Sequence, residues 1–228
     1  MTLKKYVALP ITFSLLAIGF TLFYFAGIAR ADDTNKDNNK NEDNKIETQD
    51  VRQEHGKYHA RVCSTTNAND VGCHARVVTD QKGSPQAGGL PTGLGPKDFH
   101  SAYTSQTTFS GTRKQIIAIV DAYDHPNIYN DLKTYSTTFG IPVLSQCSGP
   151  IASSPVPCFQ KVNQTGGTKY PSQNAGWALE IALDVEAAHA MCQNCSILLV
   201  EANSNSYNDL MTAVDRAISS GATVVSNS

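Results

Sequence analysis

The chain has 228 residues, which is enough for one domain of about 130–170 residues together with shorter accessory segments. Its formal net charge is −2 and 17% of its residues are charged, so it lacks the basic field that attracts nucleic acids. We therefore expect no nucleic-acid partner.

The N-terminus has the features of a signal peptide for export. Two lysines in residues 1–5 precede an apolar stretch without charge over residues 6–29, and Ala29-Arg30-Ala31 has the small-x-small form that a signal peptidase cuts. We predict a signal peptide over residues 1–31 and a secreted, extracellular protein. Because about 20 apolar residues suffice to span a bilayer, an uncleaved membrane anchor over residues 6–29 is the alternative.

A polar stretch follows over residues 32–56, with Ile46 and Val51 as its only aliphatic side chains. Such a composition buries too little apolar surface to offset the entropy lost on ordering. We therefore predict a disordered polar linker over residues 32–56. The next segment, residues 57–89, is expected to be a short N-terminal segment that contains a disulfide.

Six cysteines in an exported chain favour disulfide bonds. Their spacing favours three local pairs, although six cysteines allow many other connectivities: Cys63–Cys73, Cys147–Cys158 and Cys192–Cys195. The last pair belongs to a His-x-x-Cys-x-x-Cys cluster that begins at His189, so a metal site and a redox-active Cys-x-x-Cys are the alternatives there. No fourth ligand lies at a spacing typical of zinc.

From Lys114 onward, short apolar strands alternate with helices. Strands are predicted over residues 115–120, 159–162, 196–201 and 222–226, and helices over 127–139, 175–191 and 207–219. This alternation predicts an α/β fold with a parallel sheet and helices on both faces. The last strand should be central in such a sheet, so we expect an open edge and a sheet truncated at its C-terminal side.

The helix predicted over residues 175–191 carries two acidic residues among apolar neighbours. Glu180 and Asp184 are four positions apart, which places them on one face of the helix, one turn apart. Repulsion and burial both disfavour two charges, so we expect a shared proton and one raised pKa. Such a pair can act as a general base in acid, where a histidine is already protonated. An acidic pair on the solvent-facing side of the helix is the alternative.

Five separate motifs bear on the class of protein. They lie at residues 95–103, 119–124, 176–186, 197–202 and 224–228, and the third contains Glu180 and Asp184. In sequence and in order they resemble the sedolisin family, the secreted serine-carboxyl peptidases with a subtilisin-like fold. The resemblance runs from about Leu90 to Ser228 and implies a partial sedolisin-type peptidase domain over residues 90–228.

By this resemblance, Glu180 matches the general base for a serine nucleophile, and Asp184 matches the aspartate that orients and polarises it. The implied activity is that of a serine-type endopeptidase that hydrolyses peptides or proteins at acidic pH. In the family, the serine in its Gly-Thr-Ser context, the aspartate of the oxyanion hole and the calcium site all come later in the sequence. None of them is found up to Ser228, so we expect no cofactor in this chain and no activity from it alone.

The competing hypothesis is a non-catalytic exported domain, or a gene remnant, that binds a partner. Asp121 ends a strand, as the catalytic aspartate of true subtilisins does, but no His-Gly-Thr segment completes that triad. We therefore expect Asp121 and Asp124 to cap a helix or order a loop, and Ser226 and Ser228 to be structural serines. Residues 121–127 lack glycine, which excludes a dinucleotide-binding turn.

Overall fold

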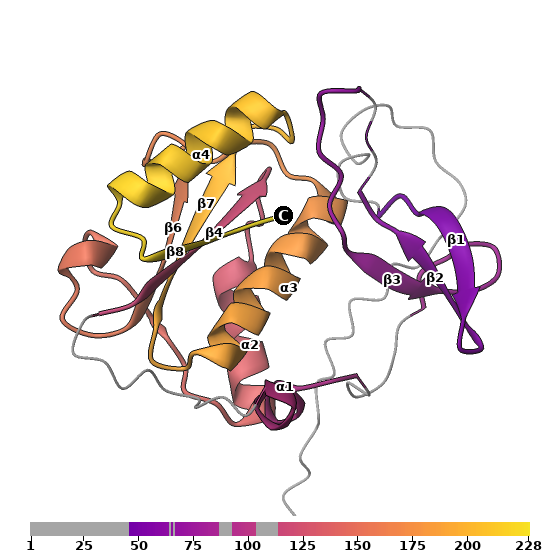
Figure 1. The fold of residues 1–228 in the computed structure, drawn as a ribbon, viewed down its shortest axis with the longest axis horizontal. Coiled ribbons are helices and arrows are strands. Elements are labelled where there is room, and N and C mark those ends of the chain that lie inside the picture. The colour runs from indigo at the N-terminus through magenta and orange to yellow at the C-terminus, as the bar shows by residue number, and fades with distance from the viewer. Residues whose placement is uncertain (1–45, 64, 66, 87–92, 104–113) are drawn as a thin grey trace, which may run out of the picture. The chain divides into compact units, whose positions relative to one another are not determined.

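The computed structural model describes residues 46–63, 65, 67–86, 93–103 and 114–228. The predicted signal peptide, the alternative anchor and most of the predicted linker lie outside these ranges. Within them, no helix is both long and apolar enough to cross a membrane. The described chain forms a five-stranded sheet and a separate three-stranded sheet (Figure 1).

The five-stranded sheet is parallel throughout and has the strand order β5-β6-β7-β4-β8. Its strands are β4 (Ile116–Ala122), β5 (Ser145–Gln146), β6 (Cys158–Asn163), β7 (Ser196–Ala202) and β8 (Val224–Asn227). The central pair, β7 and β4, consists of short apolar runs that are buried almost completely, as a strand covered on both faces requires. The predicted α/β fold with a parallel sheet is therefore confirmed.

Helices cover both faces of this sheet. On one face, α4 (Tyr207–Ser219) buries Leu210 and Ala213 against the even-numbered residues of β4 and β7. On the other face, α2 (Ile128–Phe139) and α3 (Ala175–Met191) pack against the odd-numbered residues Ile119 and Leu199. Figure 1 shows α4 and the α2–α3 pair on opposite sides of the strands. A short helix, α1 (Pro96–Tyr103), contacts α3.

Local capping explains why the helices begin and end where they do. The side chain of Asn174 accepts a hydrogen bond of 3.0 Å from the backbone N–H of Trp177, so α3 begins at the predicted residue. The α2 helix ends at Gly140, whose φ of 66° is the left-handed conformation that glycine adopts without strain. The predicted limits of α3 and α4 are confirmed, and α2 begins at Ile128, one position later than predicted.

The three-stranded antiparallel sheet corrects the predicted linker. It contains β1 (Gln49–Glu54), β2 (Lys57–Arg61) and β3 (Arg76–Thr79), in that order. All residues of β1 are exposed, so the strand is held by backbone pairing with β2 and by an ion pair of 3.2 Å between Asp50 and Arg76. The prediction of a disordered linker up to residue 56 is wrong for this strand, because composition does not reveal pairing with a distant partner.

The last strand, β8, lies at the edge of the parallel sheet. It pairs with β4 on one side, and Val225 is its one partly buried residue. Val224 is 55% exposed, although valine favours buried positions. No other strand among the described residues pairs with its outer side, which agrees with the open edge predicted from the sequence.

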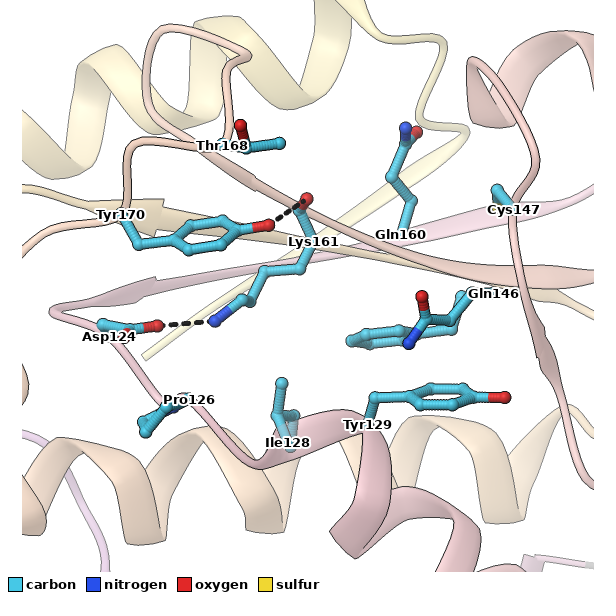
Figure 2. Close-up of a pocket in the computed structure, with 11 residues that line it drawn as sticks. Asp124, Pro126, Ile128, Tyr129, Gln146, Cys147, Gln160, Lys161, Thr168 and Tyr170 are labelled. Atoms are coloured by element: carbon cyan, nitrogen blue, oxygen red, sulfur yellow. Dashed lines mark hydrogen bonds and ion pairs between the residues drawn. The ribbon is translucent and has the colours of Figure 1, made fainter.

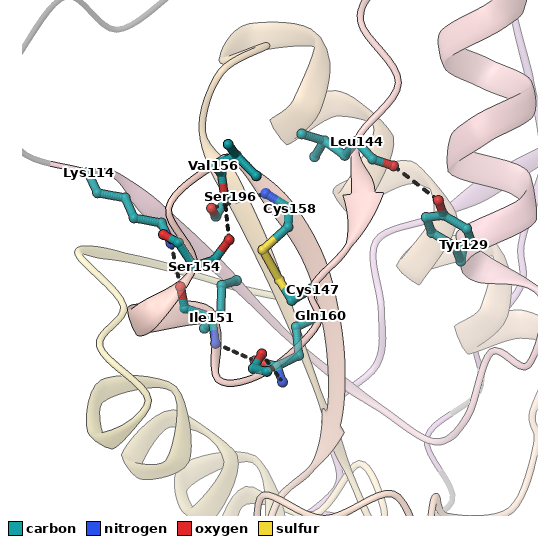
Figure 3. The surroundings of a disulfide bond; sticks show 11 residues. Lys114, Tyr129, Leu144, Cys147, Ile151, Ser154, Val156, Cys158, Gln160 and Ser196 are labelled. Carbon is teal, nitrogen blue, oxygen red and sulfur yellow. Dashed lines mark hydrogen bonds between the residues drawn. A yellow bond between two sulfur atoms is a disulfide. The ribbon is translucent and has the colours of Figure 1, made fainter.

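The three predicted cysteine pairs are confirmed as disulfides, and the described residues contain no free cysteine. Figure 3 shows how Cys147–Cys158 joins the residue after β5 to the first residue of β6. The intervening loop carries a short 3-10 helix, Ile151–Ser153, whose first N–H donates a hydrogen bond of 3.0 Å to the side-chain oxygen of Gln160. The Cys147–Cys158 disulfide therefore fixes the edge strand β5 against β6.

The pair Cys192–Cys195 follows the C-terminus of α3, where the helix dipole disfavours a thiolate. This position favours a structural disulfide over a redox-active one. In the described part of the chain, no group of three or more His, Cys, Asp or Glu side chains is placed to hold a metal ion. The ring of His189 instead makes a hydrogen bond of 2.7 Å with the carbonyl of Pro142. Three disulfides are typical of proteins that fold in an oxidising compartment.

Candidate active site

Two buried acidic residues face one another where the central strands end. In the parallel pairing of β4 and β7, Asp121 is the direct partner of Glu201, and both side chains are fully buried. The chain goes from β4 to strands on one side of it, and later returns to the other side as β8. In sheets of this type, ligands bind at the carboxyl ends of the strands near such a reversal.

The α3 helix brings Glu180 and Asp184, the two site residues predicted from the sequence, close to Asp121. Glu180 is 1% exposed and Asp184, one turn later, is partly buried. Both acidic side chains act electrostatically on Asp121 and raise its pKa. The alternative of a solvent-facing acidic pair is therefore wrong for Glu180. We refer to Asp121, Glu180, Asp184 and Glu201 as the carboxyl cluster.

Burial and repulsion between neighbouring charges raise the pKa of two members of the carboxyl cluster, Asp121 and Asp184. Burial raises the pKa of Asp121 well above its ordinary value, and the negative charges of Asp184, Glu180 and Glu201 raise it further. Burial also raises the pKa of Asp184; a hydrogen bond from Ser228 opposes this shift, and Glu180 adds to it. The raised pKa that the sequence predicts within the Glu180/Asp184 pair is therefore found at Asp184.

The hydrogen bonds of the carboxyl cluster are sparse. The Oε1 atom of Glu180 accepts a hydrogen bond of 3.3 Å from the backbone N–H of His74, while its Oε2 atom and both side-chain oxygens of Asp121 are buried without a hydrogen-bond partner. The Oδ2 atom of Asp184 accepts a hydrogen bond of 2.5 Å from the hydroxyl of Ser228. An ionised carboxylate without partners is costly to bury, so the two unpartnered oxygens of Asp121 favour the protonated form.

One lysine connects this cluster to the neighbouring loops. The Nζ atom of Lys161 lies 2.5 Å from Oδ1 of Asp124 and 3.4 Å from Oε1 of Glu201, and it is 3.9 Å from the centre of the Tyr170 ring. Despite this cation, burial raises the pKa of Glu201 to about 8; a backbone hydrogen bond from His125 and the charge of Lys161 oppose the shift. The side chain of Asp124 thus links the chain just after β4 to Lys161 of β6.

Asp121 does not have the capping or loop-ordering role that the sequence predicts. The α2 helix is preceded by Asn127, and no side chain caps it. Asp121 instead points to the face of the sheet that α3 covers, because its odd-numbered neighbour Ile119 packs there. Only the register between β4 and β7 reveals this position.

A pocket of about 470 Å³ is lined by Lys161, the ion-pair partner of Glu201, but not by any residue of the carboxyl cluster (Figure 2). Its wall includes the ion pair of Asp124 and Lys161 and the stacked rings of Tyr129 and Phe159, whose centres are 5.9 Å apart. Tyr170 closes one side, and its hydroxyl donates a hydrogen bond of 3.3 Å to the carbonyl of Lys161. Four separate stretches of chain supply these residues, so the sequence gives no signal that they meet.

No protein-family model matches the chain, and neither the curated proteins nor the solved structures contain a match to it. The assignment of a function therefore depends on the chemistry of the carboxyl cluster and on the motifs of the sequence.

Proposed function

We propose that this chain carries the carboxylate half of a serine-carboxyl peptidase site of the sedolisin type. Glu180 is the general base in this proposal, and Asp184 is the positioning residue that shares its proton. The observation that carries the proposal is the near-complete burial of Glu180, one helical turn from Asp184 and beside the buried Asp121. A solvated acidic stripe would have neither the burial nor the third carboxyl group.

The proposed reaction transfers one proton twice. The carboxylate of Glu180 takes the proton of a serine hydroxyl while the serine oxygen bonds to the peptide carbonyl carbon. It then gives the proton to the amide nitrogen as the carbon–nitrogen bond breaks, and water later releases the acyl group by the same steps. The serine is not among the motifs up to Ser228, and the family resemblance places it further along the sequence.

Acidic conditions suit this arrangement because four carboxyl groups cannot all be ionised in one buried region. The raised pKa values of Asp121 and Asp184, and that of Glu201 at about 8, keep these groups largely protonated in acid. Glu180 can then carry a single negative charge without strong repulsion from its neighbours. The pocket lined by Lys161 has the size and the mixture of aromatic and polar walls expected of a ligand site, which supports a peptide side chain as its occupant.

Acid peptidase assays of matched variants test the proposal. The complete reading frame that contains this chain should hydrolyse a denatured protein at about pH 4, and Glu180→Gln should lower kcat by roughly 10²–10⁴-fold, the usual contribution of a general base. Glu186→Gln is the matched control, because Glu186 lies on the same helix and burial raises its pKa to about 7, with a smaller contribution from Asp131. Full activity of Glu180→Gln would overturn the proposal, whereas the isolated 228-residue chain should show no turnover.

A second candidate function is supported by the edge strand. The outer edge of β8 pairs with no other described strand, and such an edge is a template for pairing with another chain. A non-catalytic exported domain could bind a partner in this way. Size-exclusion chromatography of the isolated chain distinguishes the two, because a soluble monomer that unfolds cooperatively would argue against association through β8.

A further inference from the structure

A short segment near the N-terminus lies along the loop that follows β7 as an added strand would. The backbone N–H of Val71 donates a hydrogen bond of 2.8 Å to the carbonyl of Asn205, and that of Tyr207 donates one of 3.4 Å to the carbonyl of Asn69. Between them, Asp70 and Ser206 form an antiparallel bridge. Proteins bind extended peptides with this pattern of main-chain hydrogen bonds.

The side chain of Asn205 strengthens this pairing. Its Nδ2 atom donates a hydrogen bond of 2.7 Å to the carbonyl of Val71, and its Oδ1 atom accepts one of 3.0 Å from the hydroxyl of Tyr123. Asn205 is 6% exposed, so its amide is fixed by burial as well as by both bonds. The carbonyl of Val71 is therefore held by a side chain that the protein orients in advance.

The same segment continues directly to Glu180. Cys73 is fully buried, and the next backbone N–H, that of His74, donates the hydrogen bond of 3.3 Å to Oε1 of Glu180. The Cys63–Cys73 disulfide ties the segment to Val62, whose carbonyl oxygen lies against α3 at Gly176. A Cβ atom at Gly176 would be 2.0 Å from that oxygen, so only glycine permits this approach.

We propose that residues 205–207 and the N-terminal half of α3 form a docking surface for an extended peptide, and that Asn69–His74 of the same chain occupies it. The peptide bond between Cys73 and His74 then lies at Glu180, so the segment blocks this residue from any other ligand. The role of Glu180 as a base rests on the proposed function, whereas the docking surface does not. A peptide ligand must displace the tethered segment before it reaches Glu180.

The variant Gly176→Ala tests the occupancy without substituting any residue of the carboxyl cluster. The added methyl group displaces Val62 and its segment, while alanine favours α3 over glycine by about 1 kcal/mol. Carbodiimide labelling of Glu180 in the 228-residue chain, read by mass spectrometry, should rise roughly tenfold, since release of the segment is a local opening. Gly149→Ala is the matched control, because nothing lies within 4 Å of a Cβ atom there.

Peptide binding tests whether the vacated surface takes an extended ligand. A fluorescent peptide with the sequence of residues 67–72 should bind the Gly176→Ala chain and not the wild type. Asn205→Ala in the Gly176→Ala background should weaken this binding by roughly tenfold, because a buried hydrogen bond to the peptide is lost. If Gly176→Ala does not fold, the Cys63→Ser/Cys73→Ser chain provides the same two readouts.

Unchanged labelling of Glu180 in both variants, with α3 intact by circular dichroism, would contradict the proposal that Asn69–His74 blocks Glu180. Increased labelling of Glu180 without peptide binding would contradict the proposal that residues 205–207 and α3 form a docking surface for a peptide. Neither readout needs turnover, so both are independent of the Glu180→Gln assay that decides the proposed function.

Discussion

Asp121 and Glu201 are direct partners across β4 and β7, and both carboxyl groups are fully buried on the face of the sheet that α3 covers. The α3 helix adds Glu180 and Asp184 to the same region, so the backbone register and one helix together produce the carboxyl cluster. Because burial raises the pKa of Asp121, Asp184 and Glu201, the cluster links protonation to folding.

The first prediction concerns the dependence of stability on pH. Burial raises the pKa of Glu201 from its ordinary value of 4.5 to about 8, so the folded protein binds this proton more tightly than the unfolded chain. Glu201 therefore costs no stability below about pH 4.5, and its penalty grows between pH 4.5 and 8, by at most roughly 1.4 kcal/mol per pH unit.

Glu201→Gln should make the free energy of unfolding less dependent on pH in this range. Glutamine resembles the protonated acid and can still accept the hydrogen bond of 2.9 Å from the backbone N–H of His125. Urea unfolding at several pH values measures the effect. The lowered pKa values of His125 and His189, which burial causes, act in the opposite direction below about pH 6.5, so the comparison with wild type is essential. Equal slopes for the two proteins would contradict the prediction.

Much of the fold could be predicted from the sequence because its signals are local. The helix α3 has a capping asparagine immediately before it and apolar residues along its length, and its limits are those predicted. In contrast, β1 is exposed on both sides and depends on pairing with β2, so its residues carry no hydrophobic pattern.

The candidate site could be predicted only in part. Glu180 and Asp184 share one helix, so their proximity follows from their spacing. Asp121 joins them through the register of β4 and β7, and His74 reaches Glu180 through a backbone N–H. Main-chain hydrogen bonds between distant segments do not require particular side chains, so the sequence could not indicate these contacts.

A second prediction concerns the ammonium group of Lys161. Lys161→Met should lower the free energy of unfolding at pH 7 by roughly 3–5 kcal/mol, because the carboxylate of Asp124, which is largely buried, would lose its cation. The double variant Lys161→Met/Asp124→Asn should recover part of this loss, which a double-mutant cycle measures. A double variant that is no more stable than Lys161→Met would point to packing of the lysine stem instead of charge.

A third prediction ranks two disulfides. Cys147 and Cys158 are 11 positions apart, and Cys192 and Cys195 are 3 apart. In the loop-entropy model, removal of the first pair by alanine substitution should lower the free energy of unfolding by about 3 kcal/mol, and removal of the second by about 1.5 kcal/mol. Thermal unfolding in the absence of reductant measures the order. Greater destabilisation by loss of the shorter loop would show that it holds α3 through contacts that chain entropy does not describe.

The last prediction concerns the hydroxyl of Ser228, which donates its hydrogen bond of 2.5 Å to Oδ2 of Asp184. This bond lowers the pKa of Asp184 against the larger effect of burial, so Ser228→Ala should raise that pKa further. The folded protein should then lose additional stability as the pH rises above the ordinary pKa of an aspartate, by roughly 1 kcal/mol near neutral pH for one hydrogen bond.

Carbon-13 NMR of the labelled aspartate carboxyl groups follows the titration of Asp184 directly. Ser226→Ala is the matched control, because Ser226 is an exposed residue of the same strand, β8. An upward shift in Ser228→Ala and none in Ser226→Ala would identify Ser228 as a positioning residue for Asp184. An unchanged titration in Ser228→Ala would leave Asp184 controlled by burial and by Glu180, and Ser228 would then be the structural serine that the sequence predicts.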